Sequence, residues 1–155
     1  MATEIERKFL VRDDSWRQQA APGVRLMQGY LAATPAVTVR ARLAGERGVL
    51  TIKGATRGIR RREFEYPIPA VDAKAMLDEL AATGIIEKTR YPVRLGPHTW
   101  ELDVFAGDNA GLVVAELELS GEDEPFERPS WLGAEVSDDP RYYNANLARH
   151  PFTQW

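Results

Sequence analysis

The chain has 155 residues, of which 44% are hydrophobic and 28% are charged, and its formal net charge is −3. This length and composition are typical of one globular domain with its own core, so we expect residues 1–155 to form a single domain. The absence of cysteine excludes disulfides, thiolate nucleophiles and cysteine-ligated zinc.

Short segments of alternating apolar and polar residues make up most of the chain, as is typical of antiparallel strands. Turn residues such as Thr34-Pro35 and Gly96-Pro97 separate them. Eight strands are expected, over Glu4–Val11, Val24–Ala32, Ala36–Leu43, Val49–Gly54, Ile59–Ile68, Ile86–Leu95, Thr99–Phe105 and Leu112–Ser120. Because most connections are short, we expect an antiparallel sheet that closes into a barrel and leaves no unpaired edge.

Three other stretches favour helix. Asp13 or Asp14 is expected to cap a short helical turn, because a side-chain oxygen at that position can accept from free backbone amides. Residues Ala70–Ala82 place their apolar side chains on one face of a helix. Pro140–Ala148 is expected to form a last helix. The predicted fold is therefore mainly β (α+β), with a few helices flanking the barrel.

Charged residues lie two apart in nearly every predicted strand, often with the same sign. Side chains two apart on a strand project to the same face, so each set shares one face. The sets are Glu4, Glu6 and Lys8; Arg40 and Arg42; Thr51 and Lys53; Arg61, Glu63 and Glu65; Lys88 and Arg90; Glu101 and Asp103; Glu116 and Glu118. The positions between them are mostly apolar.

For any single strand, the simpler interpretation is an ordinary sheet with its polar face in water. For the whole chain, the composition of that face argues against it, because the face carries almost only Glu, Asp, Arg and Lys. Carboxylates two apart on a strand lie ~7 Å from each other, which costs roughly 2 kcal/mol of repulsion per pair at an effective dielectric of about 20. Such repulsion requires countercharges, so we expect the charges to line the barrel interior around bound ligands.

The residue types indicate what those ligands are. Carboxylates without a histidine partner form a hard oxygen site suited to one or two Mg²⁺ or Mn²⁺ ions. The basic side chains suit phosphate oxygens and are too many for a monophosphate, which favours a linear polyphosphate. These basic residues are Lys8, Arg40, Arg42, Lys53, Arg61, Lys88 and Arg90.

The motifs resemble those of the CYTH superfamily, the triphosphate tunnel metalloenzymes. The segment Glu4–Val11 is similar to the N-terminal ExExK motif of that family, and further similar motifs follow in order. They are Val39–Arg42, Leu50–Gly54, Arg61–Glu65, Glu87–Arg90, Leu102–Phe105 and Ala115–Leu119, and the tail Ser137–Ala148 resembles the C-terminal segment of the small bacterial members. One ExExK motif is weakly specific, whereas seven motifs in order are highly specific.

The resemblance implies an eight-stranded antiparallel tunnel with a charged interior that holds a triphosphate end-on, with residues 137–155 as a helical segment at one tunnel mouth. It implies that Glu4, Glu6 and Lys8 are catalytic and that the seven basic residues named above bind phosphate. The metal ligands it implies are Glu4, Glu6, Glu63, Glu65, Asp103, Glu116 and Glu118, with Glu101 less securely part of the pattern.

We therefore expect metal-dependent hydrolysis of a linear triphosphate, with inorganic tripolyphosphate giving phosphate and pyrophosphate. In this hypothesis one ion bridges phosphate oxygens, a second activates water for in-line attack, and Glu4, with Glu6, orients that ion or water. Within the family, the alternatives are a thiamine triphosphatase and a class IV-type adenylate cyclase. The small size of the chain and the absence of an appended domain favour inorganic triphosphate.

Two alternatives of another class stay open. One is a non-catalytic polyphosphate- or nucleotide-binding module, which has little use for so many carboxylates in one cavity. The other is a structural barrel that internal ion pairs stabilise.

No signal peptide is visible in Met1–Val11, and no apolar run approaches the length needed to cross a bilayer. The nearly balanced charge provides no overall attraction to nucleic acid or to an anionic membrane. We expect a cytoplasmic protein whose partner is a small polyphosphate, without nucleic acid or membrane. The oligomeric state is open, a homodimer included.

Overall fold

The computed structural model describes residues 2–155 of the chain. This range contains nine strands: β1 (Thr3–Val11), β2 (Val24–Ala33), β3 (Val37–Ala44), β4 (Arg47–Gly54), β5 (Arg60–Ile68), β6 (Ile86–Leu95), β7 (His98–Phe105), β8 (Val113–Glu118) and β9 (Leu132–Glu135). Helix α1 (Ala70–Leu80) follows β5, and α2 (Asn144–Arg149) lies near the C-terminus. Short 3-10 helices cover Ser15–Gln18, Gly107–Asn109, Pro140–Tyr142 and Phe152–Gln154.

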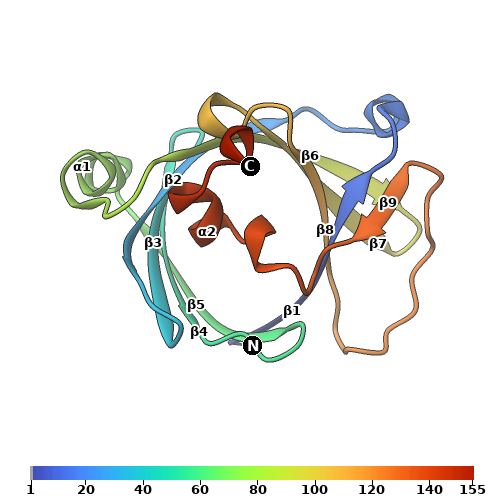
Figure 1. Ribbon diagram of the computed structural model, residues 1–155, viewed down its shortest axis with the longest axis horizontal. Helices are drawn as coiled ribbons and strands as arrows, with labels where there is room; N and C mark the ends of the chain where they lie inside the picture. Colours follow the sequence, from blue (N-terminus) through green and yellow to red (C-terminus); the bar gives the residue numbers. More distant parts are fainter. Residues whose placement is uncertain (1) are drawn as a thin grey trace.

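Strands β1 to β8 close into an antiparallel barrel (Figure 1). Neighbouring strands pair in the order β5-β4-β3-β2-β6-β7-β8-β1, and β1 returns to β5 through the pair Glu4 and Arg61. In this ring β3 is four strands away from β8, so the two lie on opposite sides of the barrel. The eight-stranded antiparallel barrel expected from the sequence is confirmed.

Strand β9 is an addition that the sequence did not predict. It pairs with the second half of β1, from Phe9 onward, where β5 no longer does, because the pairing of β1 with β5 ends at Ile5. With the sequence Leu-Gly-Ala-Glu, β9 is too short and too poor in large side chains for alternation to be recognised.

A large apolar cluster lies outside the barrel wall. Phe9, Trp100, Leu102 and Leu117 project outward from β1, β7 and β8 and are buried. Trp131, just before β9, packs on them with its ring centroid 5.5 Å from that of Trp100. Because successive side chains of a strand point to opposite faces, this outer packing leaves the inner face of the same strands to the charged residues.

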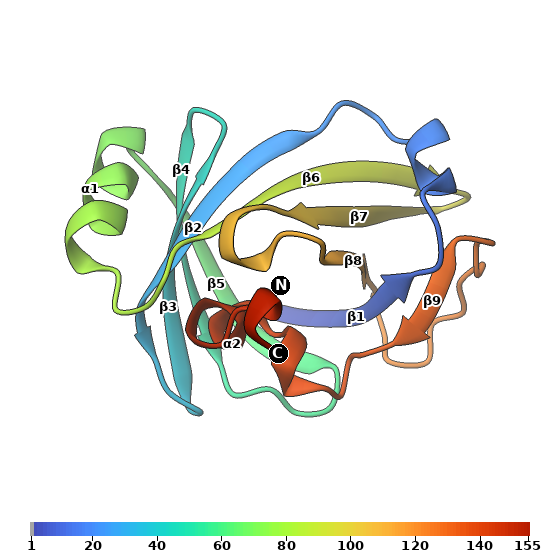
Figure 2. The ribbon, with the colours of Figure 1, turned by 45° about the horizontal axis from the view of Figure 1, so that its top comes forward.

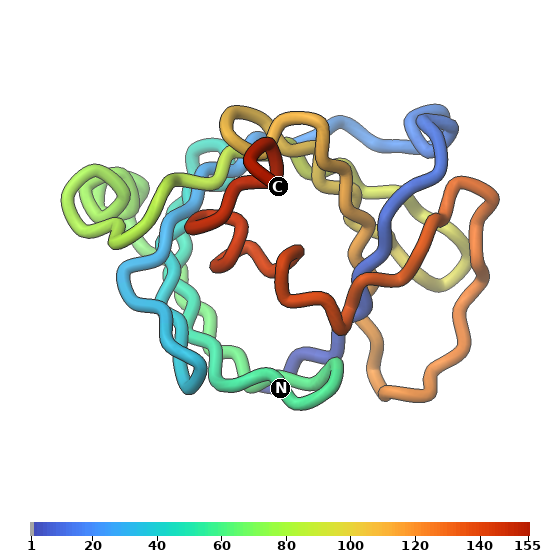
Figure 3. Tube along the Cα trace, viewed as in Figure 1, coloured from blue at the N-terminus to red at the C-terminus, as the bar shows by residue number. Residues whose placement is uncertain are grey.

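At one end of the barrel the inner face is apolar as well. Ile86, Phe105 and Val114 continue the inward positions of β6, β7 and β8 beyond the charged residues, and they share a buried cluster with Tyr142 and Leu147. The C-terminal segment is held there and lies across the ring of strands (Figures 1 and 3). Its position inside the ring brings polar side chains of this segment close to the barrel interior.

Helix α1 lies outside the barrel against β2, β3 and β4 (Figure 2) and buries Ala73 and Leu77 of its apolar face. It ends two residues earlier than predicted, because Ala81 has an extended backbone. The last predicted helix, Pro140–Ala148, is divided into a 3-10 turn and α2, because the backbone of Tyr143 is extended. No helix within residues 2–155 combines the length and hydropathy needed to cross a membrane.

Candidate active site

The inner face of the barrel surrounds a cavity of about 700 Å³. All the predicted phosphate ligands line it: Lys8, Arg40, Arg42, Lys53, Arg61, Lys88 and Arg90. The predicted metal ligands other than Asp103 line it as well: Glu4, Glu6, Glu63, Glu65, Glu116 and Glu118. Glu101 also lines it. The charged side chains that alternate along the strands therefore face one shared interior.

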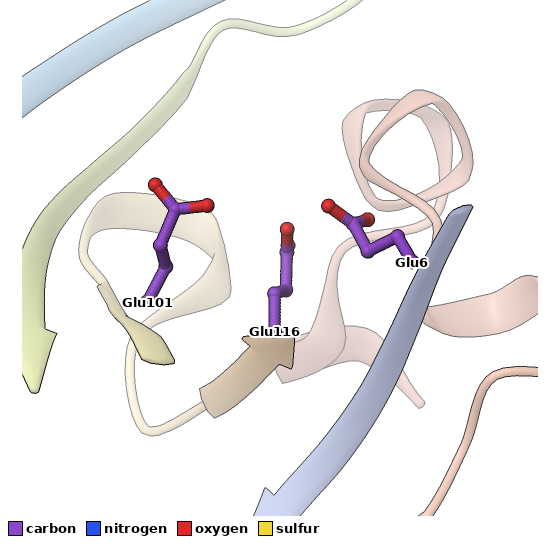
Figure 4. Close-up of side chains that lie close together, drawn as sticks. All are labelled: Glu6, Glu101 and Glu116. Carbon is purple, nitrogen blue, oxygen red and sulfur yellow. The ribbon is translucent and has the colours of Figure 1, made fainter. Parts of the chain in front are cut away.

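Three carboxylates from different strands converge on one side of the cavity (Figure 4). Glu6 comes from β1, Glu101 from β7 and Glu116 from β8, and one oxygen of each lies within 4.8 Å of the others. Strand pairing brings them together, because Glu101 lies directly opposite Glu116, and Glu6 lies opposite Glu118, two residues further along β8. Three carboxylate oxygens at this spacing can share one hard cation.

Glu6 forms no ion pair with a lysine or arginine of residues 2–155, because the nearby lysines bind its neighbours. Lys8 Nζ lies 3.6 Å from Glu116 Oε1, and Lys53 Nζ lies 2.9 Å from Glu4 Oε2. Burial and, after it, the carboxylates of Glu116 and Glu4 raise the pKa of Glu6 well above its ordinary value. Additional positive charge beside Glu6 would favour its ionised form.

The two neighbouring carboxylates are held in their ionised form. Burial opposes the ionisation of Glu116, but Lys8 and Arg90 outweigh it and hold its pKa well below the ordinary value. Burial likewise opposes the ionisation of Glu4, and Lys53 lowers its pKa. Burial also raises the pKa of Glu101, so in the cluster the pKa of Glu116 is lowered while those of Glu6 and Glu101 are raised.

Asp103 lies beneath the cavity and is fully buried. Arg90 donates to its two oxygens, from Nε at 2.8 Å and from Nη2 at 2.9 Å, and Lys88 Nζ lies 2.8 Å from Oδ2. Burial opposes its ionisation, but Lys88 and Arg90 lower its pKa. Both oxygens are occupied by protein cations, so Asp103 anchors two predicted phosphate ligands. The geometry does not favour the expectation that it holds a metal ion.

Burial also weakens the charge of two basic groups. It lowers the pKa of Lys88 to about 8, although Asp103 acts in the opposite direction. Burial, followed by the charges of Arg40 and Arg90, lowers the pKa of Arg42 to about 9. An anion bound among these groups would favour their protonated forms and would be attracted by them in return.

Three of the basic residues have only neutral partners. Arg40 Nη2 donates to Thr51 Oγ1 at 3.1 Å, and Arg42 Nε donates to Gln28 Oε1 at 2.8 Å. Arg61 Nε donates to a backbone carbonyl at 2.6 Å. In the part of the chain that the structure describes, none of the three forms an ion pair, and the buried Nε of Arg40 has no hydrogen-bond partner. Their charge is available to an anionic ligand.

The predicted acidic ligands differ in their exposure. Glu65 and Glu118 line the cavity but are exposed, whereas Glu4 and Glu116 are buried. Glu63 is half-buried and forms an ion pair with Lys53 at 3.3 Å. Glu65 and Glu118 are therefore in contact with solvent, whereas Glu116 of the cluster in Figure 4 is buried.

The C-terminal segment contributes side chains that the charge pattern did not indicate. Tyr143 and Asn144 line the cavity, with Lys8 Nζ 5.9 Å from the ring centroid of Tyr143. Asn144 Oδ1 accepts from Lys88 Nζ at 2.9 Å and from Gln28 Nε2 at 3.2 Å. The parity of β2 places Gln28 on the inner face, but one neutral amide gives no recognisable signal.

Comparison with known proteins agrees with this geometry. The family model described as "CYTH domain" matches residues 2–144. The inorganic triphosphatase of Acetivibrio thermocellus is 44% identical over 152 residues, covering 98% of this chain and 97% of the relative. That of Nitrosomonas europaea is 39% identical over 150 residues, covering 94% and 97%.

A solved structure leads to the same family. The crystal structure of an inorganic triphosphatase superposes with a TM-score of 0.66 at 36% identity, covering 96% of this chain and 95% of that one. The match to the family model, the two sequence relatives and this structure together extend over nearly the whole chain. The chain therefore belongs to the CYTH domain family, as its ordered motifs predicted.

Proposed function

We propose that this protein is a metal-dependent inorganic triphosphatase that hydrolyses tripolyphosphate to phosphate and pyrophosphate. The observation that carries the proposal is the division of charge across the cavity. Among residues 2–155, Arg40 and Arg42 on β3 have no carboxylate partner, and the carboxylates of Glu6 and Glu116 gather on β1 and β8, across the barrel. The names of the two sequence relatives support the same activity.

The basic wall suits the substrate. Arg40, Arg42 and Arg61 present guanidinium groups whose partners are neutral, and a guanidinium can bind two phosphate oxygens at once. Lys8 lies on the opposite side, on β1, where its Nζ is 3.6 Å from Glu116 Oε1 and adds a positive charge beside the carboxylates. A linear triphosphate along the cavity would replace these weak neutral contacts with ionic ones.

The acidic wall suits a divalent cation. We assign Glu6, Glu101 and Glu116 as its central ligands, with Glu4 beside them, because Glu6 has a raised pKa and no cationic partner among residues 2–155. A set of carboxylate oxygens without histidine favours Mg²⁺ or Mn²⁺. When bound, the cation neutralises phosphate charge and makes water a better nucleophile. Asp103 is left out of this set, because protein cations occupy both its oxygens.

The residues of the chain then divide the work of phosphoryl transfer. Positive charge beside Glu6 would favour its ionised form, and Glu4, with Glu6, would orient the attacking water. Lys8 and Arg90, which already lie beside Glu116, neutralise the charge that accumulates on the pyrophosphate leaving group. Glu63, Glu65 and Glu118 provide further negative charge toward the solvent.

The remaining expectations concern the protein as a whole. We infer that residues 1–155 act as one domain, since the segment 137–155 contributes Asn144 to the same cavity as β1 to β8. The cytoplasmic location, the absence of a nucleic-acid or membrane partner and the oligomeric state stay predictions from the sequence.

The experiment that tests the proposal measures phosphate release from tripolyphosphate, ATP and thiamine triphosphate, each with Mg²⁺, Mn²⁺ or EDTA. We expect turnover of tripolyphosphate that requires the metal and yields one phosphate and one pyrophosphate. Glu4→Ala and Lys8→Ala should both lose turnover and keep a cooperative unfolding transition. Retained turnover in both variants would contradict the assignment, and a preference for an organic triphosphate would redirect it.

Thermal unfolding separates the proposal from the alternatives of another class. A triphosphate that binds the folded state stabilises it by RT ln(1 + L/Kd), where L is the free ligand concentration, so the melting temperature rises with the logarithm of that concentration once the ligand is in excess of its Kd. A rise without phosphate release would identify a non-catalytic binding module. If triphosphate neither raises the melting temperature nor is hydrolysed, the protein is a barrel whose ion pairs serve stability alone.

A further inference from the structure

We propose that Asn144 is a positioning residue that fixes two substrate-binding cations at once, Lys88 directly and Arg42 through Gln28. This inference rests on the proposed function and extends it to a part of the chain that carries no charge. Asn144 begins α2, whereas Gln28, Arg42 and Lys88 belong to β2, β3 and β6. The four side chains come from segments far apart in the sequence and are joined by hydrogen bonds, and three of them, Arg42, Lys88 and Asn144, line the cavity.

The contacts form one continuous relay. Asn144 Oδ1 accepts from Lys88 Nζ at 2.9 Å and from Gln28 Nε2 at 3.2 Å. Gln28 in turn accepts, through Oε1, from Arg42 Nε at 2.8 Å. Each amide therefore has its oxygen toward donors, and the amide of Gln28 has its nitrogen toward an acceptor, so the hydrogen bonds determine both orientations.

Burial makes these contacts hard to replace. Gln28 is fully buried and Lys88 is 1% exposed, so water cannot readily substitute for a lost partner. A buried polar group that loses its partner keeps the full cost of its desolvation. Without Gln28, the guanidinium of Arg42 would lose its hydrogen bond in the described chain and would be free to turn away from repulsion by Arg40.

The neutrality of the relay is central to its function. Arg90 is positioned by the carboxylate of Asp103, which offsets part of its charge and is shared with Lys88. Arg42 is positioned by an amide, so its whole positive charge remains available to a phosphate. An amide relay therefore provides orientation without competing with the substrate, which a carboxylate in the same place would do.

The experiment measures kcat and KM for tripolyphosphate in Asn144→Ala, Gln28→Ala, Arg42→Ala and the pairwise combinations. We expect Asn144→Ala and Gln28→Ala each to lower kcat/KM by about tenfold. In the Arg42→Ala background, Gln28→Ala should have little further effect, because the residue that it positions is already absent. Asn144→Ala should also shift the alkaline limb of the kcat/KM profile to lower pH, because Lys88 loses an acceptor.

Asn109→Ala is the matched control. Asn109 is buried outside the cavity, and its Oδ1 accepts from the backbone amide of Phe152 at 2.8 Å, so it holds the same C-terminal segment without contacting the relay. We expect Asn109→Ala to lower the melting temperature and to leave kcat/KM within about twofold of wild type.

The outcomes are distinct. An equal loss of kcat/KM in Asn109→Ala and Asn144→Ala would reduce the role of Asn144 to docking of the segment and overturn the inference. Independent, multiplicative effects of Gln28→Ala and Arg42→Ala would overturn it as well. If Asn144→Ala does not fold, Gln28→Ala with Arg42→Ala still decides the question. An inactive wild-type protein contradicts the proposed function instead.

Discussion

Arg90 binds Asp103 through two parallel hydrogen bonds, from Nε to Oδ1 at 2.8 Å and from Nη2 to Oδ2 at 2.9 Å. Lys88 Nζ completes the arrangement at 2.8 Å from Oδ2. The carboxylate is fully buried, and its two partners line the cavity above it. A carboxylate in this position fixes the direction of two cations toward the ligand.

Asp103→Ala is therefore expected to lower the free energy of unfolding strongly and to change the affinity for metal little. Removal of one partner of a buried ionic network costs about 3–5 kcal/mol, because the remaining charges stay buried without compensation. Urea unfolding followed by circular dichroism measures this loss, and titration with Mn²⁺ measures metal affinity. A variant with wild-type stability and much weaker metal affinity would restore Asp103 to the metal ligands.

Glu6→Gln tests the unusual ionisation of Glu6. Because its pKa is raised in the folded protein, Glu6 keeps its proton at pH values where the unfolded chain has released it. Its contribution to stability is thus complete below the pKa of an unfolded glutamate and is lost as pH rises through the folded pKa. In EDTA, the melting temperature of wild type should fall with pH over this window relative to Glu6→Gln.

Metal should reverse that difference. Mg²⁺ is expected to raise the melting temperature of wild type at neutral pH and to have much less effect on Glu6→Gln, because the amide cannot supply negative charge. Thermal unfolding with and without the ion is the measurement. Parallel curves for both proteins in both buffers would show that Glu6 neither binds the metal nor carries an unusual proton.

Lys88→Arg tests the basic group with the lowered pKa. The pKa of Lys88 is about 8 in the ligand-free protein, so its charge, and with it the binding of triphosphate, should decline above that pH. The kcat/KM profile should fall on the alkaline side from about pH 8, and Lys88→Arg should move this limb to higher pH, because arginine stays protonated. An unmoved limb would assign the titration to another group.

Glu101→Gln tests the carboxylate that the family pattern left least secure. Its oxygens lie within the cluster of Glu6 and Glu116, so its loss should weaken Mn²⁺ binding by at least about tenfold. The matched control is Glu87→Gln on β6, where Glu87 lies outside the cavity and pairs with Arg25 at 3.3 Å. Calorimetric titration without triphosphate should separate the two variants, and equal affinities would remove Glu101 from the site.

Alternation predicted which face of each strand is charged, because the face depends only on whether a position is odd or even along the strand. That rule brought Lys8, Arg42 and Glu116 to one cavity. It could not predict depth along the tunnel, which depends on how the strands are staggered. Glu101 and Asp103 share a face of β7, yet the first lines the cavity and the second lies beneath it.

Contacts between neutral groups far apart in the sequence were beyond the reach of the pattern. Gln28 and Asn144 lie 116 residues apart, and a single amide on a strand or in a tail is common without any such role. Strand β9 escaped recognition for a related reason. Its pairing depends on β1 separating from β5 after Ile5, which is a property of the closed barrel and of no local segment.

The alternation of β1 also determines which changes in chain length the wall can accommodate. Glu4, Glu6 and Lys8 face the cavity, while Ile5 and Phe9 belong to the outer apolar cluster. One residue inserted after Glu4 would move every later side chain of the strand to the other face. Glu6 and Lys8 would then point into the outer apolar cluster, and Phe9 would point into the cavity. Two inserted residues would keep charged side chains facing the cavity and apolar side chains facing outward. Insertions within these strands should therefore be tolerated in even numbers, and insertions of any length only in the hairpins.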